Sequence, residues 1–184
     1  MASRSTSKRR RFPRRVTWVG LLAALIAAAV RFHPAPHASA LPTQAVVRHV
    51  IDGDTVEIDD GRHLRYLGID TPEMRKHVGD RWIEDPQPFA REATALNRQL
   101  VEGKTVRLEY DVQTHDKYGR LLAYVYEEKI MVNEELLRQG VAQTMTIPPN
   151  VKYAERFRML AREAREAGRG LWSRVTSMGK RRAK

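Results

Sequence analysis

Cysteine is absent from this chain of 184 residues. Its absence excludes a disulfide framework, catalysis by a thiol, and metal binding through thiolates. Six histidines are present, but none stand at spacings typical of metal ligands. A chain without disulfide bonds must be stabilised by its hydrophobic core, and this length allows one compact domain with appendages. Hydrophobic residues make up 42% and charged residues 30%, which is typical of a globular protein.

Acidic residues are missing from both ends of the chain, because all 22 lie within residues 52–166. Basic residues are concentrated where the acids are missing: seven lie in 1–15, one is Arg31, and four lie in 180–184. Of the 33 basic residues, 21 remain in 41–179, so this central part is almost neutral. The net charge of +11 therefore belongs to the two ends, and it gives little support to nucleic-acid binding by the centre.

The sequence also lacks a hydrophobic run of clear transmembrane length. The candidate run, Val16–Val30, follows a basic segment and would extend about 22 Å as a helix, against roughly 30 Å for the hydrocarbon core of a bilayer. It is followed by Ala38-Ser39-Ala40, which has the form of an A-x-A cleavage site. This order predicts a secretory signal peptide cleaved near Ala40, and the alternative is an uncleaved anchor that attaches the protein to the membrane through residues 16–30. Either way the remaining chain is expected to be exported, and after cleavage it would be secreted or periplasmic.

Three parts of the chain follow from these patterns. Residues 1–40 are the signal peptide or anchor with its linker, and residues 41–175 are the folded domain. Residues 176–184 form a basic tail that is expected to be disordered. No internal repeat is visible in the sequence.

The folded part is predicted to be mainly β, with helices. Runs of β-branched and aliphatic residues indicate five strands, at Ala45–Ile51, Thr55–Ile58, Leu64–Ile69, Thr105–Tyr110 and Leu121–Tyr126. Helical spacing and end signals indicate three helices, one from Phe89 to Leu100, one capped by Asn133 and ending at Gln139, and one capped by Asn150 and ending before Gly168. Residues 74–88 are polar and are predicted to be a surface loop. This order is typical of a small closed β-barrel of the OB type, a five-stranded OB-fold with three packed α-helices.

Residues capable of chemistry gather in three segments at predicted turns and strand ends. These segments are Asp52-Gly53-Asp54-Thr55, Asp70-Thr71-Pro72-Glu73 and Asp116-Lys117-Tyr118-Gly119-Arg120. A single aspartate in a turn is usually a solvated turn former. Arg65 is different, because it lies within an apolar predicted strand, where a guanidinium needs an anion or a carboxylate as partner.

If the first three strands form a meander, Asp54, Asp70 and Glu73 gather at one end of the barrel. Clustered carboxylates repel one another unless a hard cation neutralises them, and oxygen ligands suit Ca²⁺ or Mg²⁺. Such a cation beside Arg65 and Arg120 would form a phosphate site, because the metal and both guanidiniums bind phosphoryl oxygens. The residues alone therefore predict a metal-assisted phosphodiesterase.

Four stretches of the chain together resemble the staphylococcal nuclease (thermonuclease) family. They are Ile51–Val56, Arg65 with Ile69–Glu73, Asp116–Arg120 with Leu122-Ala123-Tyr124, and Met131–Glu134 with Arg138-Gln139-Gly140. Each is weak alone, but their order and spacing match from about Thr43 to Ser173. The resemblance implies an OB barrel and a calcium-dependent nuclease that acts on DNA and RNA, with a preference for single-stranded or frayed substrates, as a monomer. It also implies that the 5′ P–O bond is cleaved and that 3′-phosphate ends are left.

The resemblance also implies how one Ca²⁺ ion would be held. Asp54 and Asp70 match the carboxylates that ligate the ion, and the main-chain carbonyl at Thr71 matches a third ligand. Asp52 would support this site through a water molecule.

The remaining roles that the resemblance implies concern the substrate. Arg65 and Arg120 would bind the scissile phosphate and stabilise the transition state, in which charge grows on the phosphoryl oxygens. Glu73 would orient or deprotonate the attacking water. Lys117 and Tyr118 would contact the phosphate of the terminal nucleotide.

The sequence departs from the family pattern where substrate bases would stack. Thr146 and Pro148 stand at the positions of two stacking tyrosines, so stacking there is expected to be weaker. The 74–88 segment is longer than in the family and contains Trp82, which would either replace this stacking or pack locally. A non-catalytic, membrane-tethered OB module that binds nucleic acid or a partner protein is the alternative function. Degenerate relatives of that kind lose the acids and arginines that this chain retains.

Overall fold

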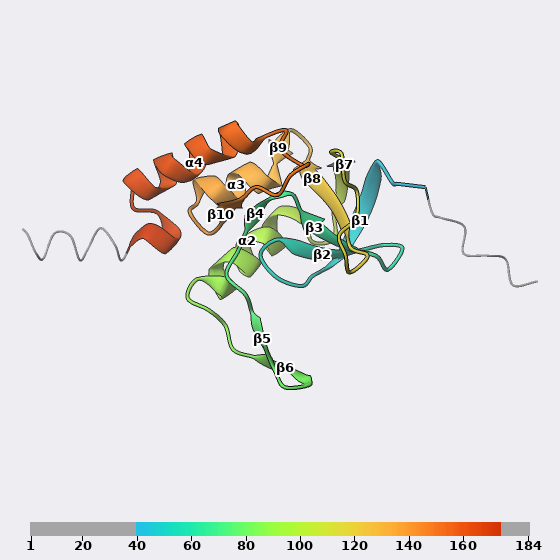
Figure 1. Ribbon diagram of the computed structural model, residues 1–184, viewed down its shortest axis with the longest axis horizontal. Coiled ribbons are helices and arrows are strands. Elements are labelled where there is room, and N and C mark those ends of the chain that lie inside the picture. Colours follow the sequence, from blue (N-terminus) through green and yellow to red (C-terminus); the bar gives the residue numbers. More distant parts are fainter. Residues whose placement is uncertain (1–39, 174–184) are drawn as a thin grey trace, which may run out of the picture. The chain divides into compact units, whose positions relative to one another are not determined.

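Figure 1 shows the computed structural model, which describes residues 40–173. The predicted signal peptide or anchor in 1–39 and the basic tail in 176–184 lie outside the described residues, so both stay predictions. Within 40–173, no helix combines the length and the apolar character that crossing a membrane requires.

The domain is built on a closed barrel of five strands. These strands are β1 (Gln44–Val50), β2 (Thr55–Ile58), β3 (His63–Tyr66), β7 (Thr105–Glu109) and β8 (Leu121–Glu127). They pair in the order β3-β2-β1-β7-β8, all antiparallel, and a parallel pairing of β3 with β8 closes the barrel. A short strand, β9 (Ile130–Met131), extends the sheet beyond β8. The prediction of a five-stranded OB barrel is therefore confirmed, including the meander of the first three strands.

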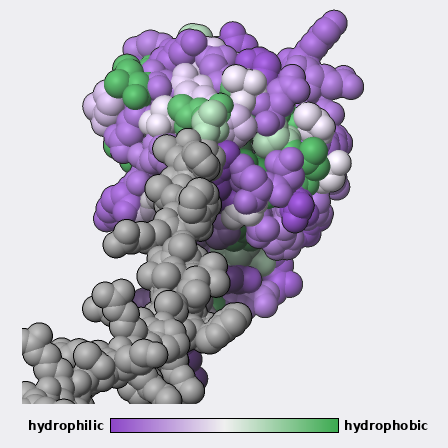
Figure 2. All heavy atoms as spheres, turned by 90° about the vertical axis from the view of Figure 1, so that its right-hand side faces the viewer, coloured by the Kyte–Doolittle hydropathy of each residue, from purple (hydrophilic) through white to green (hydrophobic). Residues whose placement is uncertain are grey.

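The core lies inside the barrel and beneath three helices. Alternate residues of the strands point inward, as in β3, where Leu64 and Tyr66 are buried while Arg65 lies on the other face. Helix α2 (Ala90–Val101) packs against β1 and α3, while α3 (Val132–Arg138) packs against β8 and α4 (Ala154–Glu166). Hydrophilic residues dominate the described part of the face in Figure 2, and hydrophobic residues appear there only in small separate groups.

The predicted strand Leu64–Ile69 is two strands, because the chain turns sharply at Gly68. Strand β3 ends at Tyr66, and β4 (Gly68–Asp70) pairs instead with β10 (Gln143–Met145). Gly68 has a φ of 78°, and a Cβ atom there would lie 2.6 Å from the ring of Phe157. Only glycine fits both constraints. The turn takes the chain out of the barrel, so that Asp70 is placed at its rim.

Two predicted helix caps are wrong. Asn133 lies inside α3, where its side chain accepts a hydrogen bond from the Val125 N–H (3.0 Å) and donates one to the Leu67 carbonyl (2.8 Å). Asn150 precedes α4 and bonds both the N–H and the carbonyl of Gln113, each at 2.8 Å. Both amides satisfy backbone groups outside the two helices, and neither helix start has a side-chain cap.

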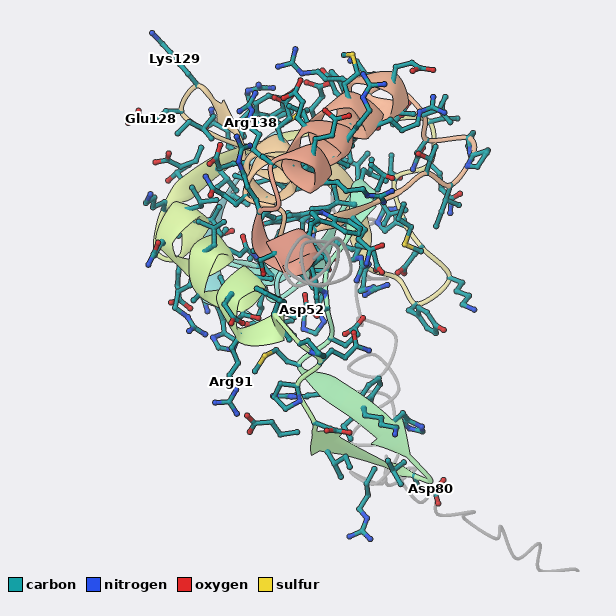
Figure 3. All side chains as sticks on the ribbon, turned by 90° about the vertical axis from the view of Figure 1, so that its left-hand side faces the viewer. Asp52, Asp80, Arg91, Glu128, Lys129 and Arg138 are labelled. Carbon is teal, nitrogen blue, oxygen red and sulfur yellow. The ribbon has the colours of Figure 1, made fainter. Side chains whose placement is uncertain are left out.

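The polar segment 74–88 is not only a loop, because it contains a β-hairpin. Strands β5 (Arg75–Val78) and β6 (Arg81–Glu84) pair antiparallel and form a two-stranded sheet of their own. The hairpin projects away from the barrel, with Asp80 at its tip (Figures 1 and 3). All eight of its strand residues are exposed, so it lacks the apolar and polar alternation that predicts a half-buried strand.

Candidate active site

The turn between β1 and β2 directs Asp54 into the protein. The Asp52 N–H donates to the Thr55 carbonyl, and the Asp52 carboxylate accepts a hydrogen bond from the Asp54 N–H at 3.1 Å. Gly53 lies so close to its surroundings that an added Cβ would stand 2.6 Å from the hydroxyl oxygen of Thr71. The glycine is therefore required for close approach, and the turn is pressed against the segment that carries Thr71.

Asp54 is a fully buried carboxylate with several partners. One oxygen lies 2.7 Å from a terminal nitrogen of Arg65 and also accepts from the Thr55 hydroxyl, while the other accepts from the Thr71 N–H at 2.9 Å. Burial raises the pKa of Asp54 well above its ordinary value, and the negative charges of neighbouring aspartates add to this effect. Arg65 opposes the shift without cancelling it. An additional positive charge near Asp54 would favour its ionised form.

Arg65 joins the two aspartates of the site. It lies on β3 between Thr55 of β2 and Leu122 of β8, and its side chain is 13% exposed. One terminal nitrogen contacts Asp54, and the other donates to Asp70 at 2.5 Å. Burial works to lower the pKa of Arg65, but the two carboxylates outweigh it and raise that pKa. The expectation that this arginine requires carboxylate partners is confirmed.

Asp116 shapes the loop that carries Arg120. One carboxylate oxygen of Asp116 accepts from the N–H groups of Tyr118 and Arg120, each at 2.9 Å, and the other accepts from the Arg120 Nε at 2.6 Å. Burial alone would raise the pKa of Asp116, but these hydrogen bonds lower it. Lys117 lies over the exposed Tyr118 ring, with its Nζ 5.0 Å from the ring centroid. This role of Asp116 was not predicted, although an acid at the start of a tight turn is a signal for it.

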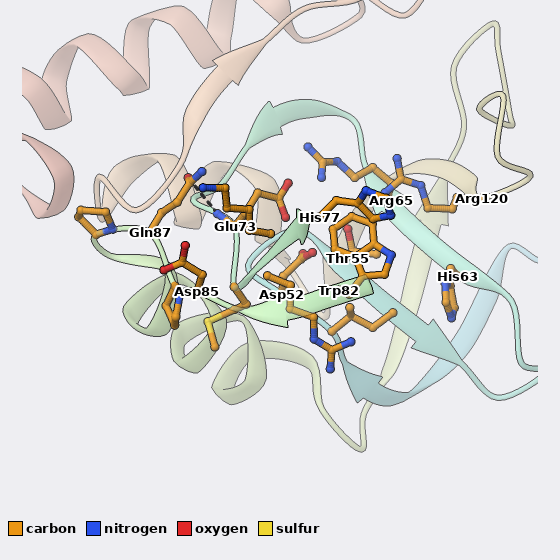
Figure 4. Close-up of a pocket in the computed structure, with 16 residues that line it drawn as sticks. Asp52, Thr55, His63, Arg65, Glu73, His77, Trp82, Asp85, Gln87 and Arg120 are labelled. Carbon is orange, nitrogen blue, oxygen red and sulfur yellow. Dashed lines mark hydrogen bonds between the residues drawn. The ribbon is translucent and has the colours of Figure 1, made fainter. Parts of the chain in front are cut away.

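Glu73 is held at the base of the hairpin by Gln87. The Glu73 N–H donates to the Gln87 side chain at 3.2 Å, and the Gln87 N–H donates to the Glu73 carbonyl at 3.0 Å (Figure 4). Burial raises the pKa of Glu73, and the charge of Asp52 adds to this, while Arg65 and Arg120 act in the opposite direction. Sequence reasoning missed Gln87, because nothing local marks a glutamine as the partner of a residue fourteen positions earlier.

Two grooves meet at this site, and three residues line both of them: Arg65, Glu73 and Arg120. The first, which we call the barrel groove, has a volume of about 620 Å³, and its further lining includes Asp70, Lys117, Tyr118, Leu122, Met145 and Ile147. The second, which we call the hairpin groove, has a volume of about 920 Å³, and its further lining includes Asp52, Arg75, Lys76, His77, Trp82 and Gln87 (Figure 4). The shared residues therefore stand where a ligand would pass from one groove into the other.

This arrangement is accompanied by similarity to a known family. Residues 63–174 match the family described as "Staphylococcal nuclease homologue". The chain belongs to the staphylococcal nuclease family. The "Thermonuclease" of Staphylococcus hyicus is 41% identical over 134 residues, 71% of this chain and 76% of that protein. The "Thermonuclease" of Staphylococcus intermedius is 38% identical over 132 residues (70% and 76%), and "Endonuclease YncB" of Bacillus subtilis (strain 168) is 39% identical over 137 residues (70% and 63%). The resemblance found in the sequence is thus confirmed.

The site residues expected of a staphylococcal nuclease come together at one end of the barrel. Arg65 contacts Asp54 and Asp70 directly, and Arg120 and Glu73 line the same two grooves as Arg65. Asp52 lines the hairpin groove, and Lys117 and Tyr118 line the barrel groove. The N–H of Thr71 donates a hydrogen bond to Asp54.

The positions expected to lack stacking tyrosines do not line the barrel groove. Met145 and Ile147 line it, rather than Thr146 and Pro148. This wall of the groove is therefore aliphatic. Trp82 lines the other groove, so it does not replace an aromatic side chain at this place.

A metal ion of the kind expected in a staphylococcal nuclease needs oxygen ligands. No group of three or more His, Asp or Glu side chains within residues 40–173 is arranged to hold a metal. Asp54 and Asp70 nevertheless fit a hard cation, because both are carboxylates that contact the same guanidinium. A further positive charge would also stabilise the ionised form of the buried Asp54. Two carboxylates and a main-chain carbonyl, with water and substrate oxygens, form a donor set that Ca²⁺ accepts.

Proposed function

We propose that this protein is a calcium-dependent nuclease that hydrolyses phosphodiester bonds in DNA and RNA. The observation that carries the proposal is the meeting of two guanidiniums and the carboxylate of Glu73 at the junction of two grooves. A phosphodiester differs from a terminal phosphate in that the chain continues on both sides, and a junction of two grooves accommodates that shape. The thermonuclease and endonuclease relatives support the same activity.

One Ca²⁺ ion would be held by Asp54, Asp70 and the carbonyl of Thr71, with Asp52 acting through water. When bound, the ion would supply positive charge that polarises a phosphoryl oxygen and offsets the buried carboxylate. Arg65 is already fixed between the two aspartates, so it would lie beside such an ion.

The protein's own side chains would divide the hydrolysis between them. Arg65 and Arg120 would hold the scissile phosphate and stabilise the charge that grows on its oxygens. Glu73 would take the proton of the water that attacks phosphorus, and its raised pKa makes it a stronger base than an ordinary glutamate. The 5′ P–O bond would then break, the departing 5′ oxygen would take a proton from solvent, and the other product would keep a 3′-phosphate.

The barrel groove would receive the nucleotide on one side of the cleaved bond. Lys117 and Tyr118 line it and would contact the phosphate of the terminal nucleotide. A strand whose bases are unpaired can follow such a groove more easily than a duplex, so single-stranded or frayed substrates would be preferred. We propose that the protein acts as a monomer.

The test is digestion of single-stranded DNA and RNA by the full chain, with Ca²⁺ and with excess chelator. Wild-type protein should digest both nucleic acids only with Ca²⁺, and Arg120→Ala should lower kcat by about 10²-fold or more. Arg162→Ala serves as the matched control, because Arg162 is exposed on α4 and lines neither groove. Circular dichroism would establish that both variants are folded. Full activity in chelator would contradict the metal role, and tight binding without cleavage in Ca²⁺ would favour the non-catalytic module instead.

We further propose that the domain works outside the cytoplasm, released by cleavage near Ala40 or held to the membrane by residues 16–30. The order of charge, apolar run and A-x-A site supports this proposal. Sequencing the N-terminus of the exported protein separates the two forms. A start near Leu41 indicates release, and an intact N-terminus indicates an anchor.

A further inference from the structure

The hairpin groove contains chemistry that the proposed hydrolysis does not use. Beyond Arg65, Glu73 and Arg120, one wall of this groove is built by the β5–β6 hairpin. All strand residues of the hairpin are exposed, and its two strands hydrogen-bond in a sheet separate from the barrel. Its large side chains therefore contribute little to the core, and the stability of the barrel does not account for them.

The pairing register gives the hairpin two different faces. Trp82 lies opposite His77 and Arg75 lies opposite Glu84, and alternate residues share a face, so these four side chains are on the same side. Of these four, Trp82, His77 and Arg75 line the hairpin groove, whereas Glu84 contacts Arg91 of α2 at 3.4 Å. The groove face of the hairpin is therefore aromatic and cationic.

Trp82 presents its ring to the groove rather than to a core. The residue is 66% exposed, and its ring meets His77 edge to face, with centroids 5.0 Å apart and an interplanar angle of 69°. An edge-to-face neighbour supports the ring without covering both of its faces. Figure 4 shows both rings at the groove that also holds Arg65 and Arg120.

Two further cations line the groove, Arg75 on the same face of the hairpin as these rings and Lys76 on the other face. Neither forms a salt bridge within the described part of the chain. An exposed aromatic face next to unpaired cations is the combination that binds single-stranded nucleic acid, in which the base stacks and the phosphate meets the charge. A base that is paired inside a duplex cannot reach such a platform.

We propose that the hairpin groove is a second nucleotide subsite, which binds the nucleotide on the opposite side of the scissile phosphate from Lys117 and Tyr118. Trp82 stacks on the base, and Arg75 binds the adjoining phosphate. The proposal rests on the proposed function for the place of the scissile phosphate at Arg65 and Arg120.

The test is the affinity of the full chain for a fluorescently labelled single-stranded oligonucleotide, measured by anisotropy in excess chelator. Trp82→Ala should weaken binding by roughly 5-fold or more, because stacking on an aromatic ring is lost. Trp82→Phe should restore most of the affinity. Ile83→Ala is the matched control, because Ile83 is the neighbouring exposed residue on the other face of the hairpin, and it should bind as wild type does.

Arg75→Ala gives a second measurement that does not depend on the tryptophan. Loss of one phosphate contact should reduce the slope of log affinity against log salt concentration by about 0.7 for a single strand. Equal affinity in Trp82→Ala and wild type, with an unchanged salt slope in Arg75→Ala, would overturn the subsite. Binding in chelator is read without cleavage. If wild-type binding depends on Trp82 but the protein does not cleave in Ca²⁺, the proposed nuclease activity is contradicted and the subsite is supported. If the protein cleaves in Ca²⁺ but the Trp82 and Arg75 variants bind as wild type does, the subsite is contradicted and the nuclease activity is supported.

Discussion

The two grooves beside the site are built in different ways. The barrel groove has walls fixed by the body of the domain: Leu122 lies in β8, Asp70 in β4, and Tyr118 in a loop tied by Asp116. The hairpin groove has one wall that projects from the body and is joined to it through few contacts, among them the reciprocal bonds of Gln87 with Glu73. The three residues with proposed chemical roles line both grooves, and in the proposed function the projecting wall adds substrate contacts only.

Removal of Arg65 should have the largest effect, because this residue lines both grooves and also pairs with the buried Asp54. Arg65→Ala is expected to lower kcat by about 10³-fold or more, since a guanidinium is lost from the phosphate. It should also destabilise the fold by several kcal/mol, because Asp54 is left buried without its partner. Urea unfolding measures the second effect. Arg120→Ala, which removes a more exposed arginine, should lose activity with little loss of stability, and equal destabilisation of the two variants would contradict this distinction.

Substitution of Glu73 should have the next largest effect and should change the pH dependence. A base must be ionised, so activity should fall as the pH falls through the raised pKa of Glu73, which lies above the ordinary value for a glutamate. Glu73→Gln should lower kcat by about 10²-fold and remove this acidic limb. The measurement is kcat against pH for both proteins.

The same substitution should not lower the stability of the protein, in contrast to its effect on activity. Because the pKa of Glu73 is higher in the folded than in the unfolded state, the carboxyl group contributes stability at low pH that is lost as the pH rises through the folded value. Glu73→Gln should therefore be at least as stable as wild type at neutral pH. A variant that is much less stable there would show that the glutamate is needed for the fold.

The smallest effects should come from the residues that position each groove. Asp116→Ala releases Tyr118 and Arg120 together and is expected to lower kcat/KM by about 10- to 100-fold, because a misplacement of about 1 Å costs this much. Gln87→Ala removes one long hydrogen bond to Glu73 and should cost only about 3-fold. Kinetics with both variants, and with the conservative Asp116→Asn as rescue, test the difference between the grooves. An equal loss for Asp116→Ala and Gln87→Ala would mean that both grooves are fixed to the same degree.

The features that sequence predicts are those whose signal is local. The five barrel strands follow from runs of β-branched residues, and Arg65 is conspicuous because it interrupts an apolar run. The predicted caps at Asn133 and Asn150 fail because both amides bond backbone groups that only the tertiary structure brings near.

The hairpin and the role of Gln87 were not predictable for a related reason. Fully exposed strands carry no alternation of apolar and polar residues, so 74–88 looks like a loop. The role of Gln87 depends on a partner fourteen residues away, whereas Asp116 bonds residues two and four positions later, so the turn offered a local signal for it. The break at Gly68 depends on the ring of Phe157, which lies in α4, so no pattern within 64–69 reveals it.

The parallel pairing of β3 with β8 has a consequence for when the protein becomes active. It places Arg65 beside Leu122, two residues after Arg120, although the two arginines come from distant parts of the chain. The pairing that closes the barrel therefore also brings the segments that carry the two guanidiniums side by side. We expect a chain that has opened at this seam to lose the proposed catalytic arrangement, so that activity would be a readout of the closed barrel.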